Sequence, residues 1–347
     1  MLLKRAIGSG VAVKVRSVTR LPLHHPLAQV LHPFLSAGGS DGGPAEVSCR
    51  LLPASRPVFR FTTAGGRAAV GKFFIGRPGR FTADLSLLWE YRHYHQAEAW
   101  GLTPGVHLPR LLGRSRRLRL GLLLEDIPGP DLDHFLALAC NGGGSSGLPD
   151  RLGLLARLLV EFHTRPVPAG DLSPAPALAY LAKLRRQLGA RGLLTPAQDD
   201  LLEEEGRAWG ARFAAFADRP VPVHGDATPT NFLFPDGRAV AVDLERLRVA
   251  DRLFDLSWVA AEIRHAWGWR AHDLKGGEEA IGSFFRSYLT ALNAAPDLAR
   301  RLFALNPFYM ALGELRICRN AYLSPTYRRR LLAEALECLA GGRRLAL

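Results

Sequence analysis

The sequence predicts an α+β fold, with a small antiparallel sheet near the N-terminus and a larger, mainly helical region after it. One observation is a series of short runs rich in β-branched and aromatic residues, all of which lie before residue 125. Another is the helical spacing of apolar residues that dominates from residue 150 to the C-terminus. The chain has 347 residues and 48% hydrophobic content, so it can bury a substantial core in two lobes.

Residues 1–45 are expected to be an irregular N-terminal segment. They contain a short apolar stretch, residues 27–35, that Pro33 interrupts, and they end in a glycine-rich run. Charged residues and glycines break residues 1–15, so these lack the continuous apolar core of a signal peptide.

Five short runs predict the strands of a first domain over residues 46–127. They are Val47 to Leu52, Val58 to Thr62, Ala68 to Ile75, Val106 to Leu112 and Leu118 to Leu124. The second and third runs are separated by Ala64, Gly65 and Gly66, which is a hairpin signal. We therefore expect a five-stranded antiparallel sheet.

Lysine is scarce in this chain, yet Lys72 lies inside the third of these runs. A buried ammonium group is costly unless it is paired, so Lys72 needs an acidic partner. The helical pattern that follows, residues 84–100, carries Glu90, and Glu98 lies about two turns further along. Glu90 is the preferred partner and Glu98 is the alternative.

The chain changes character at residues 125–130, where two prolines and a glycine break the last strand and lead to a helix near Asp131. This turn would join the first domain to a mainly helical second domain over residues 128–347. Helical patterns there run from Asp150 to Ala217 and from Glu278 to the end, with a helix start at Thr195.

The most informative pattern lies in residues 223–245. His224 and Asp226 are followed by Asn231, and Asp243 ends a second apolar run. Phosphoryl transfer needs a carboxylate that accepts the proton of an attacking hydroxyl, and oxygen ligands for the metal ion on the nucleotide phosphates. The spacing therefore predicts the catalytic loop of a kinase, and an ordinary hydrogen-bonded turn is the alternative.

This loop resembles that of the aminoglycoside phosphotransferase and choline kinase superfamily, small-molecule relatives of the protein kinases. The resemblance covers most of the chain from about residue 46. It implies a two-lobed protein-kinase-like fold, with a five-stranded N-lobe and a larger helical C-lobe. It makes Asp226 the catalytic base, Asn231 and Asp243 the Mg²⁺ ligands, and His224 the residue that braces the loop.

The resemblance also implies a nucleotide site for ATP or GTP. Lys72 held by Glu90 would position the phosphates. The backbone around Glu125 and Ile127 would bind the adenine edge. Asp255, at the start of a later helix, would anchor the catalytic loop.

Two departures from the family pattern affect particular roles. The loop of residues 53–57 has no glycine, so phosphate contacts there would come from Ser55 or its neighbours. Thr228 stands where protein kinases have a lysine. Arg246, Arg248 or a second metal ion would therefore have to stabilise the transferring phosphoryl group.

The acceptor is expected to be a small molecule, because the gap between Asp243 and Asp255 is too short for an activation loop and a peptide platform. Glu245 replaces the glycine expected after the metal-binding aspartate of protein kinases; a second Mg²⁺ and a neighbouring arginine are its two candidate partners.

The acceptor should lie over Asp226, where Glu262, His265 and Trp267 are the candidate contacts. Trp267 and Trp269 would stack on a sugar ring or a quaternary ammonium group, and the alternative for both is packing in the core or a lid.

The net charge of +13 argues against a surface built to attract polycationic aminoglycosides. A sugar, an amino alcohol or a lipid or glycolipid head group is the favoured acceptor, with an aminoglycoside as the alternative. A catalytically silent nucleotide-binding scaffold is the alternative from another class. No nucleic-acid module is recognisable, so no nucleic-acid partner is expected, while the basic final helices leave peripheral contact with an anionic surface open.

Four scattered cysteines, Cys49, Cys140, Cys318 and Cys338, form no close metal-binding pairs and fit reduced thiols in a cytoplasm. No apolar run reaches the length of a membrane span. A cytoplasmic enzyme is therefore expected.

Overall fold

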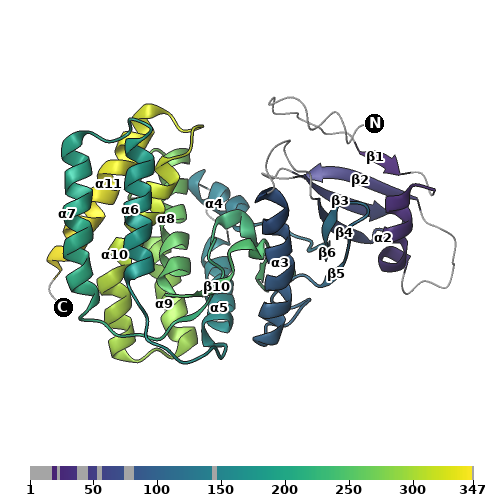
Figure 1. Cartoon of the computed structure of the whole chain (residues 1–347), viewed down its shortest axis with the longest axis horizontal. Helices are drawn as coiled ribbons and strands as arrows, with labels where there is room; N and C mark the ends of the chain where they lie inside the picture. Colours follow the sequence, from purple (N-terminus) through teal and green to yellow (C-terminus); the bar gives the residue numbers. More distant parts are fainter. Residues whose placement is uncertain are drawn as a thin grey trace. The chain divides into compact units, whose positions relative to one another are not determined.

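The computed structural model describes residues 18–21, 24–36, 46–52, 57–73, 82–142 and 147–345. The chain divides into two compact units, Met1–Pro128 and Gly129–Leu347 (Figure 1). An antiparallel sheet lies in the first unit and most of the helices lie in the second, which confirms the predicted α+β fold class.

The sheet of the N-terminal unit has six strands in the order β1-β2-β3-β4-β6-β5, and every neighbouring pair is antiparallel. The strands are β1 (Thr19–Leu21), β2 (Val47–Leu52), β3 (Val58–Thr63), β4 (Ala68–Phe73), β5 (Leu111–Ser115) and β6 (Leu120–Glu125). The predicted hairpin joins β3 to β4, and Gly66 has a φ of 82° there, a value that glycine adopts without strain. Helix α3 (Thr82–Ala99) contacts β6.

The N-terminal segment differs from the expectation of an irregular leader. Residues within it form β1 and helix α2 (Pro26–Ser36), so the sheet has six strands and not five. Pro33 was expected to interrupt the apolar stretch, but it lies on the exposed side of α2. The buried side is therefore continuous, and its contact with the sheet outweighs the backbone hydrogen bond that a proline removes.

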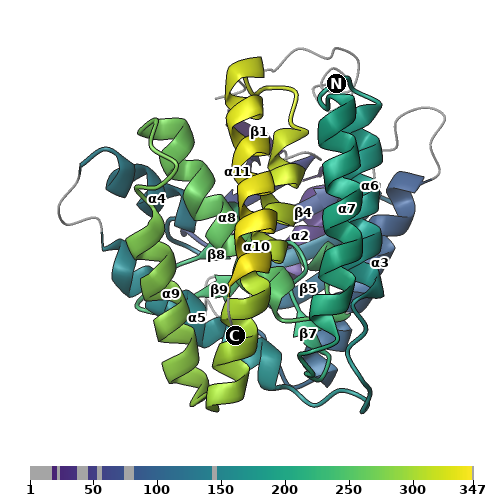
Figure 2. The ribbon, with the colours of Figure 1, turned by 90° about the vertical axis from the view of Figure 1, so that its left-hand side faces the viewer.

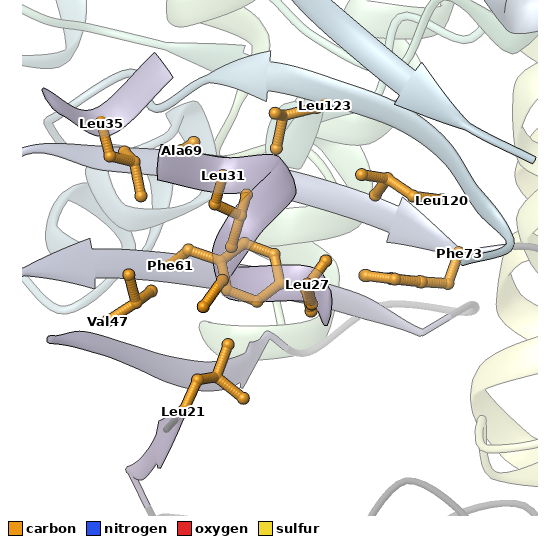
Figure 3. Close-up of a cluster of buried hydrophobic side chains, with 11 residues drawn as sticks. Leu21, Leu27, Leu31, Leu35, Val47, Phe61, Ala69, Phe73, Leu120 and Leu123 are labelled. Atoms are coloured by element: carbon orange, nitrogen blue, oxygen red, sulfur yellow. The ribbon is translucent and has the colours of Figure 1, made fainter. Parts of the chain in front are cut away.

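Helix α2 and the sheet share a hydrophobic core (Figure 3). Leu27, Leu31 and Leu35 project from one side of the helix, at the spacing of one turn. Figure 3 shows them beside Phe61 of β3 and other strand residues; the core also contains Leu21, Ala28, Val47, Ala69, Phe73, Leu120 and Leu123.

A second difference concerns β5, which begins at Leu111, whereas the run from Val106 to Leu112 was the predicted strand. The backbone turns between Pro104 and Leu108, where Gly105 donates its N–H to the Leu108 carbonyl at 2.6 Å. Val106 is exposed at this turn, so the apolar residue at that position does not contribute to the sheet.

The C-terminal unit is mainly helical. Its helices are α4 (Leu132–Cys140), α5 (Leu148–Thr164), α6 (Ala175–Gly189), α7 (Pro196–Phe213), α8 (Leu253–Arg270), α9 (Glu278–Leu292), α10 (Pro296–Cys318) and α11 (Pro325–Arg344). Helix α10 packs against both α8 and α11, and α5 packs against α9. Figure 2 shows α10 and α11 side by side, with the neighbouring pair α6 and α7. No helix of the described residues is both long and apolar enough to cross a membrane.

Four short strands lie between α7 and α8 and shape the loops of the site. They are β7 (Val221–Val223), β8 (Phe232–Leu233), β9 (Val240–Ala241) and β10 (Arg248–Ala250). Strand β7 pairs with β10, and β8 pairs with β9, both antiparallel. Two single turns of 3₁₀ helix, Pro229–Asn231 and Leu244–Arg246, interrupt this segment. The chain therefore folds back on itself around the predicted catalytic loop.

Candidate active site

Lys72 and Glu90 form an ion pair in the N-terminal unit. Nζ of Lys72 lies 2.6 Å from Oε1 of Glu90, and the Glu90 side chain is completely buried. Lys72 lies in β4 between β3 and β6, so the strand fixes where its side chain starts. Glu98, the alternative partner, is exposed on α3. Burial of the carboxylate makes this pairing necessary, because an unpaired charge there would be strongly destabilising.

Glu125 and Ile127, the predicted contacts of the adenine edge, lie at the end of β6 and just after it. Glu125 pairs with Ala69 in the sheet, and its N–H donates to the Arg110 carbonyl at 2.9 Å. Ile127 follows outside the strand and is buried. Among the described residues, its backbone N–H has no hydrogen-bond partner. Ser55 lies outside the described residues.

His224 connects the two parts of the predicted catalytic loop in the C-terminal unit. Its Nε2 lies 2.9 Å from the Val242 carbonyl, and its Nδ1 lies 3.3 Å from the backbone N of Asp226. A carbonyl can only accept, so Nε2 carries the proton and Nδ1 accepts from Asp226. The buried imidazole therefore ties Asp226 to the residue before Asp243.

Asp255, in the first turn of α8, holds the loop from the other side. Its two carboxylate oxygens accept the backbone N–H groups of His224 at 2.7 Å and Gly225 at 2.8 Å. His163 contributes a third contact at 3.3 Å. Burial would raise the pKa of Asp255, but the contacts with His163, His224 and Gly225 hold it below the usual value. A buried carboxylate with these partners fixes the backbone just before Asp226.

Asn231 and Asp243 supply oxygen atoms that suit Mg²⁺. Nδ2 of Asn231 donates to the Asp226 carbonyl at 2.9 Å, so Oδ1 is the atom of this amide that would ligate a metal ion. The Val242 N–H donates to the Asn231 carbonyl at 2.9 Å, so the residue before Asp243 is tied to Asn231. The described residues contain no group of three or more His, Cys, Asp or Glu side chains that could hold a metal ion. Two protein ligands are nevertheless sufficient where nucleotide phosphates and water complete the coordination of Mg²⁺.

Two arginines flank the carboxylate of Asp226. Nε of Arg246 lies 3.8 Å from Oδ2, and Nη1 of Arg316 lies 3.9 Å from Oδ1. Arg246 was one of the predicted compensating cations. Arg248 was another, but its Nη1 donates to the backbone carbonyls of Gly225 and Arg246, and it forms no ion pair with a carboxylate of the described residues.

Arg316 was not singled out as a site residue from the sequence, where it is one of many basic residues near the C-terminus. It comes from α10, a helix that is buried over most of its last two turns. An arginine inside such an apolar stretch is the signal that would have found it, since a buried cation requires a partner. The two candidate partners of Glu245 were a second Mg²⁺ and a neighbouring arginine. Its Oε1 lies 3.6 Å from Nε of Arg246.

Of the three predicted acceptor contacts, Glu262 is the one linked to Asp226. Arg316 forms an ion pair with Glu262 through Nη2 while its Nη1 faces Asp226. Burial raises the pKa of Glu262, and Arg316 opposes that effect.

His265 and Trp267 lie elsewhere on α8. Nδ1 of His265 lies 2.9 Å from the Tyr327 hydroxyl. The ring of Trp267 packs against Gly276, where an added Cβ atom would lie 2.5 Å from Cδ1 of the tryptophan. Trp269 instead joins His265 and Tyr327 in an aromatic cluster, with ring centroids 6.4 and 5.3 Å from theirs. The two tryptophans therefore do not form one stacking surface, because residues two apart on a helix point about 200° away from each other.

Comparisons with known proteins show the fold and the family of the chain. No curated protein sequence is significantly similar to the chain. A choline kinase from Cryptosporidium parvum has a TM-score of 0.60 and 11% identity, over 91% of this chain and 95% of that one. An ethanolamine kinase from Plasmodium vivax has a TM-score of 0.57 and 10% identity, over 89% of this chain and 87% of that one. An ADP-bound aminoglycoside phosphotransferase has a TM-score of 0.55 and 17% identity, over 84% and 94%.

These likenesses show a shared fold, the two-lobed fold of small-molecule kinases. The sequence itself matches the model of a family described as "Phosphotransferase enzyme family" over residues 50–302, which is most of the chain. That range includes the Lys72–Glu90 pair, the loop around Asp226 and the start of α8. The chain therefore belongs to the phosphotransferase enzyme family and is a phosphotransferase with an alcohol group as its acceptor.

Proposed function

We propose that the chain transfers the γ-phosphoryl group of ATP or GTP to a hydroxyl of a small molecule in the cytoplasm, with Asp226 as the base. The observation that carries this proposal is the fixation of the backbone around Asp226 by His224 and Asp255. Catalysis of phosphoryl transfer depends mainly on positioning and electrostatic stabilisation, and a loop held at both ends supplies the first of these.

The residues of the loop have separate roles in this proposal. Asp226 orients the acceptor hydroxyl and accepts its proton as the bond to phosphorus forms. Asn231 and Asp243 would hold Mg²⁺, which neutralises charge on the nucleotide phosphates when it is bound. His224 keeps Asp226 and Asp243 in register through its two ring nitrogens.

The arginines beside Asp226 provide the cationic stabilisation that Thr228 cannot. Arg246 and Arg316 approach opposite oxygens of the carboxylate, at 3.8 and 3.9 Å. Both distances are longer than a normal hydrogen bond, so neither guanidinium is committed to Asp226. They would attract the negative charge of the transferring group.

The nucleotide site is assigned to residues 46–127. Lys72, oriented by buried Glu90, would contact the phosphates. The N–H of Ile127, which has no hydrogen-bond partner in the described part of the chain, would bind the adenine edge, with Glu125 beside it. The acceptor site is assigned to the helices of residues 128–347, with Glu262 as its best-supported contact because of the shared partner Arg316.

A substitution of Asp226 tests the proposal. We expect Asp226→Asn to lower kcat for nucleotide-dependent phosphorylation by roughly 10²–10⁴-fold, the range for removal of a general base. Nucleotide affinity, measured by calorimetry, should change little. The matched control is Asp236→Asn, an exposed aspartate in the nearby hairpin, which should keep full activity. Full turnover by Asp226→Asn would refute the proposed role.

A further inference from the structure

A cavity of about 480 Å³ lies in the C-terminal unit beside the loop that carries Asp226. Gly225, the residue before Asp226, and Arg246, which reaches its carboxylate, both line the cavity. The volume is within the range of small-molecule sites. The cavity therefore adjoins the catalytic loop at Gly225, although Asp226 itself is not among its lining residues.

Aromatic side chains make the cavity suitable for an apolar or flat body. Tyr180, Phe254, Trp258 and Tyr309 all line it. The rings of Tyr180 and Trp258 are 6.1 Å apart, and those of Phe254 and Trp258 are 6.2 Å apart. Such surfaces hold sugar and aromatic rings through large contact areas at a low cost in conformational entropy.

Arg248 gives the cavity a positive charge that no ion pair with a described residue neutralises, although Asp255 and Asp226 attract it from a longer distance. Its guanidinium lies over the Phe254 ring at 4.7 Å, and the described residues provide hydrogen-bond partners to its Nη1 alone, both of them carbonyls. No carboxylate among those residues forms an ion pair with it. Because desolvation lowers the pKa of Arg248, burial has a cost that a bound anion would remove.

The lining also contains two carboxylates, which differ in how far their charge is already compensated. Asp251 is buried and already accepts from both Nη atoms of Arg301 and from the Tyr309 hydroxyl. Asp171 is exposed and has no cation partner among the described residues. Two more cations adjoin the cavity, because Arg316 lies 4.5 Å over the Trp258 ring and Arg246 lines the wall. Arg246 and Arg316 are themselves ion-paired to carboxylates, so Arg248 is the arginine of the lining that forms no ion pair with the described residues.

We propose that this cavity binds the part of the acceptor that does not react, and that the acceptor carries an oxyanion, a carboxylate or a phosphate, on an apolar or ring-shaped body. Arg248 and Arg246 bind the oxyanion, and the aromatic wall holds the body, with the hydroxyl at Asp226. This inference rests on the proposed function, which it deepens by naming the acceptor's chemical class. It also excludes a polycationic acceptor, which would be repelled by these arginines.

Binding of four matched probes, measured by calorimetry without nucleotide, tests the inference. The probes share a ring and a hydroxymethyl group: para-(hydroxymethyl)benzoate, para-(hydroxymethyl)phenyl phosphate, the neutral para-(hydroxymethyl)benzyl alcohol and the cationic para-(hydroxymethyl)benzylamine. We expect at least one anionic probe to bind about tenfold or more tightly than the neutral one, and the amine to bind most weakly. The benzoate and the phosphate ester distinguish the two sources of the oxyanion.

Variants separate the charge from the ring contacts. Arg248→Gln and Arg246→Gln should each reduce the preference for the anionic probes several-fold and leave binding of the neutral alcohol nearly unchanged. Tyr180→Leu should weaken every probe by a similar factor and keep the order of preference. Arg329→Gln removes the same charge from an exposed position on α11 and should change nothing.

Equal affinity for the neutral and anionic probes would overturn the inference, as would an anion preference that survives both arginine substitutions. Failure of all probes to bind at millimolar concentration would also overturn it. A different result would refute the proposed function. If the chain bound the anionic probes but consumed no nucleotide with any hydroxyl acceptor, the cavity assignment would stand and the kinase assignment would be wrong. Conversely, if the amine were the one probe to be phosphorylated, the kinase assignment would stand and the proposal of an oxyanion on the acceptor would be refuted.

Discussion

Gly225 is the position in the catalytic loop that tolerates no side chain. Its φ is 75°, and a Cβ atom there would lie 2.3 Å from the Arg246 carbonyl oxygen. The short distance arises because the segment leading to β10 crosses directly beside the loop. The glycine between His224 and Asp226 is therefore required by the close approach of two backbone segments as well as by its own conformation.

We expect Gly225→Ala to displace the loop, lower the free energy of unfolding by more than about 2 kcal/mol and reduce kcat strongly. The matched control is Gly237→Ala, which has a φ of 73° but nothing within 4 Å of a Cβ atom. It should lose only about 1 kcal/mol, the cost of the backbone conformation itself. Urea unfolding and steady-state kinetics measure both. Equal effects of the two substitutions would contradict the role of the Arg246 carbonyl.

His265 provides a prediction about pH. Burial, with further repulsion from Arg270 and Arg316, lowers its pKa from 6.5 to about 4. Between those values the unfolded chain binds a proton that the folded chain excludes. His265 therefore contributes stability above pH 6.5, and that contribution is lost as the pH falls toward 4.

The difference in unfolding free energy between the wild-type chain and His265→Gln measures this contribution. We expect the wild-type chain to lose more stability than the variant between pH 6.5 and pH 4.5, since glutamine does not titrate. NMR of the imidazole should show the ring neutral at pH 5.5. A His265 resonance that titrates near its ordinary value would disprove the shift.

Helix α8 positions the catalytic loop through its first turn. Asp255 accepts two backbone N–H groups of the loop, and Asp251 just before the helix accepts the Leu253 N–H at 3.0 Å. Asp251 is also bound by Arg301 of α10. The start of α8 is therefore fixed between the loop and α10.

Replacing Asp255 by asparagine should uncouple the loop from α8. An amide presents one acceptor and one donor, so one of the two N–H groups of His224 and Gly225 would face another N–H. We expect Asp255→Asn to lower the free energy of unfolding by about 3 kcal/mol and to reduce kcat more than nucleotide affinity. Asp297→Asn, at the exposed first turn of α10, is the control and should stay within about 0.5 kcal/mol of the wild-type chain.

The N-terminal unit depends on α2 to cover its sheet. Leu31 is completely buried in the cluster that joins α2 to the strands. We expect Leu31→Ala to lower the free energy of unfolding of this unit by about 3 kcal/mol, through lost burial and a residual cavity. Hydrogen exchange should show lost protection in β2, β3 and β4. Gln29→Ala, on the exposed side of the same helix, should leave protection unchanged.

Because each unit has its own core, protection in α10 and α11 should also remain unchanged in Leu31→Ala. A loss of protection spread equally over both units would instead mean that the chain unfolds as one cooperative body. The two outcomes separate a local role of α2 from a global one.

Local patterns accounted for much of the fold and of the candidate site. The runs that became β2, β3, β4 and β6 were recognisable because β-branched and aromatic residues and hairpin glycines act over a few neighbours. The Lys72–Glu90 pair followed from the cost of burying a lysine. The helix start at Thr195 was also recognisable from neighbouring residues, because the side chains of Thr195 and Gln198 form a capping box.

Contacts between distant segments could not be obtained in this way. Helix α2 forms despite Pro33 because its buried side meets a sheet made of residues that come later in the chain. Arg316 reaches Asp226 because α10 packs against α8, and no local pattern specifies that packing.

The amino-acid order is sufficient for the α+β class, for most strands and for a loop with Asp226, Asn231 and Asp243 at phosphoryl-transfer spacing, because those features depend on residues close in the chain. Packing of α6, α8 and α10 determined which cations surround Asp226 and which aromatic residues line the adjoining cavity. The physical reason is that the charge around a carboxylate depends on every side chain within a few ångströms, and in this fold those side chains come from distant parts of the sequence.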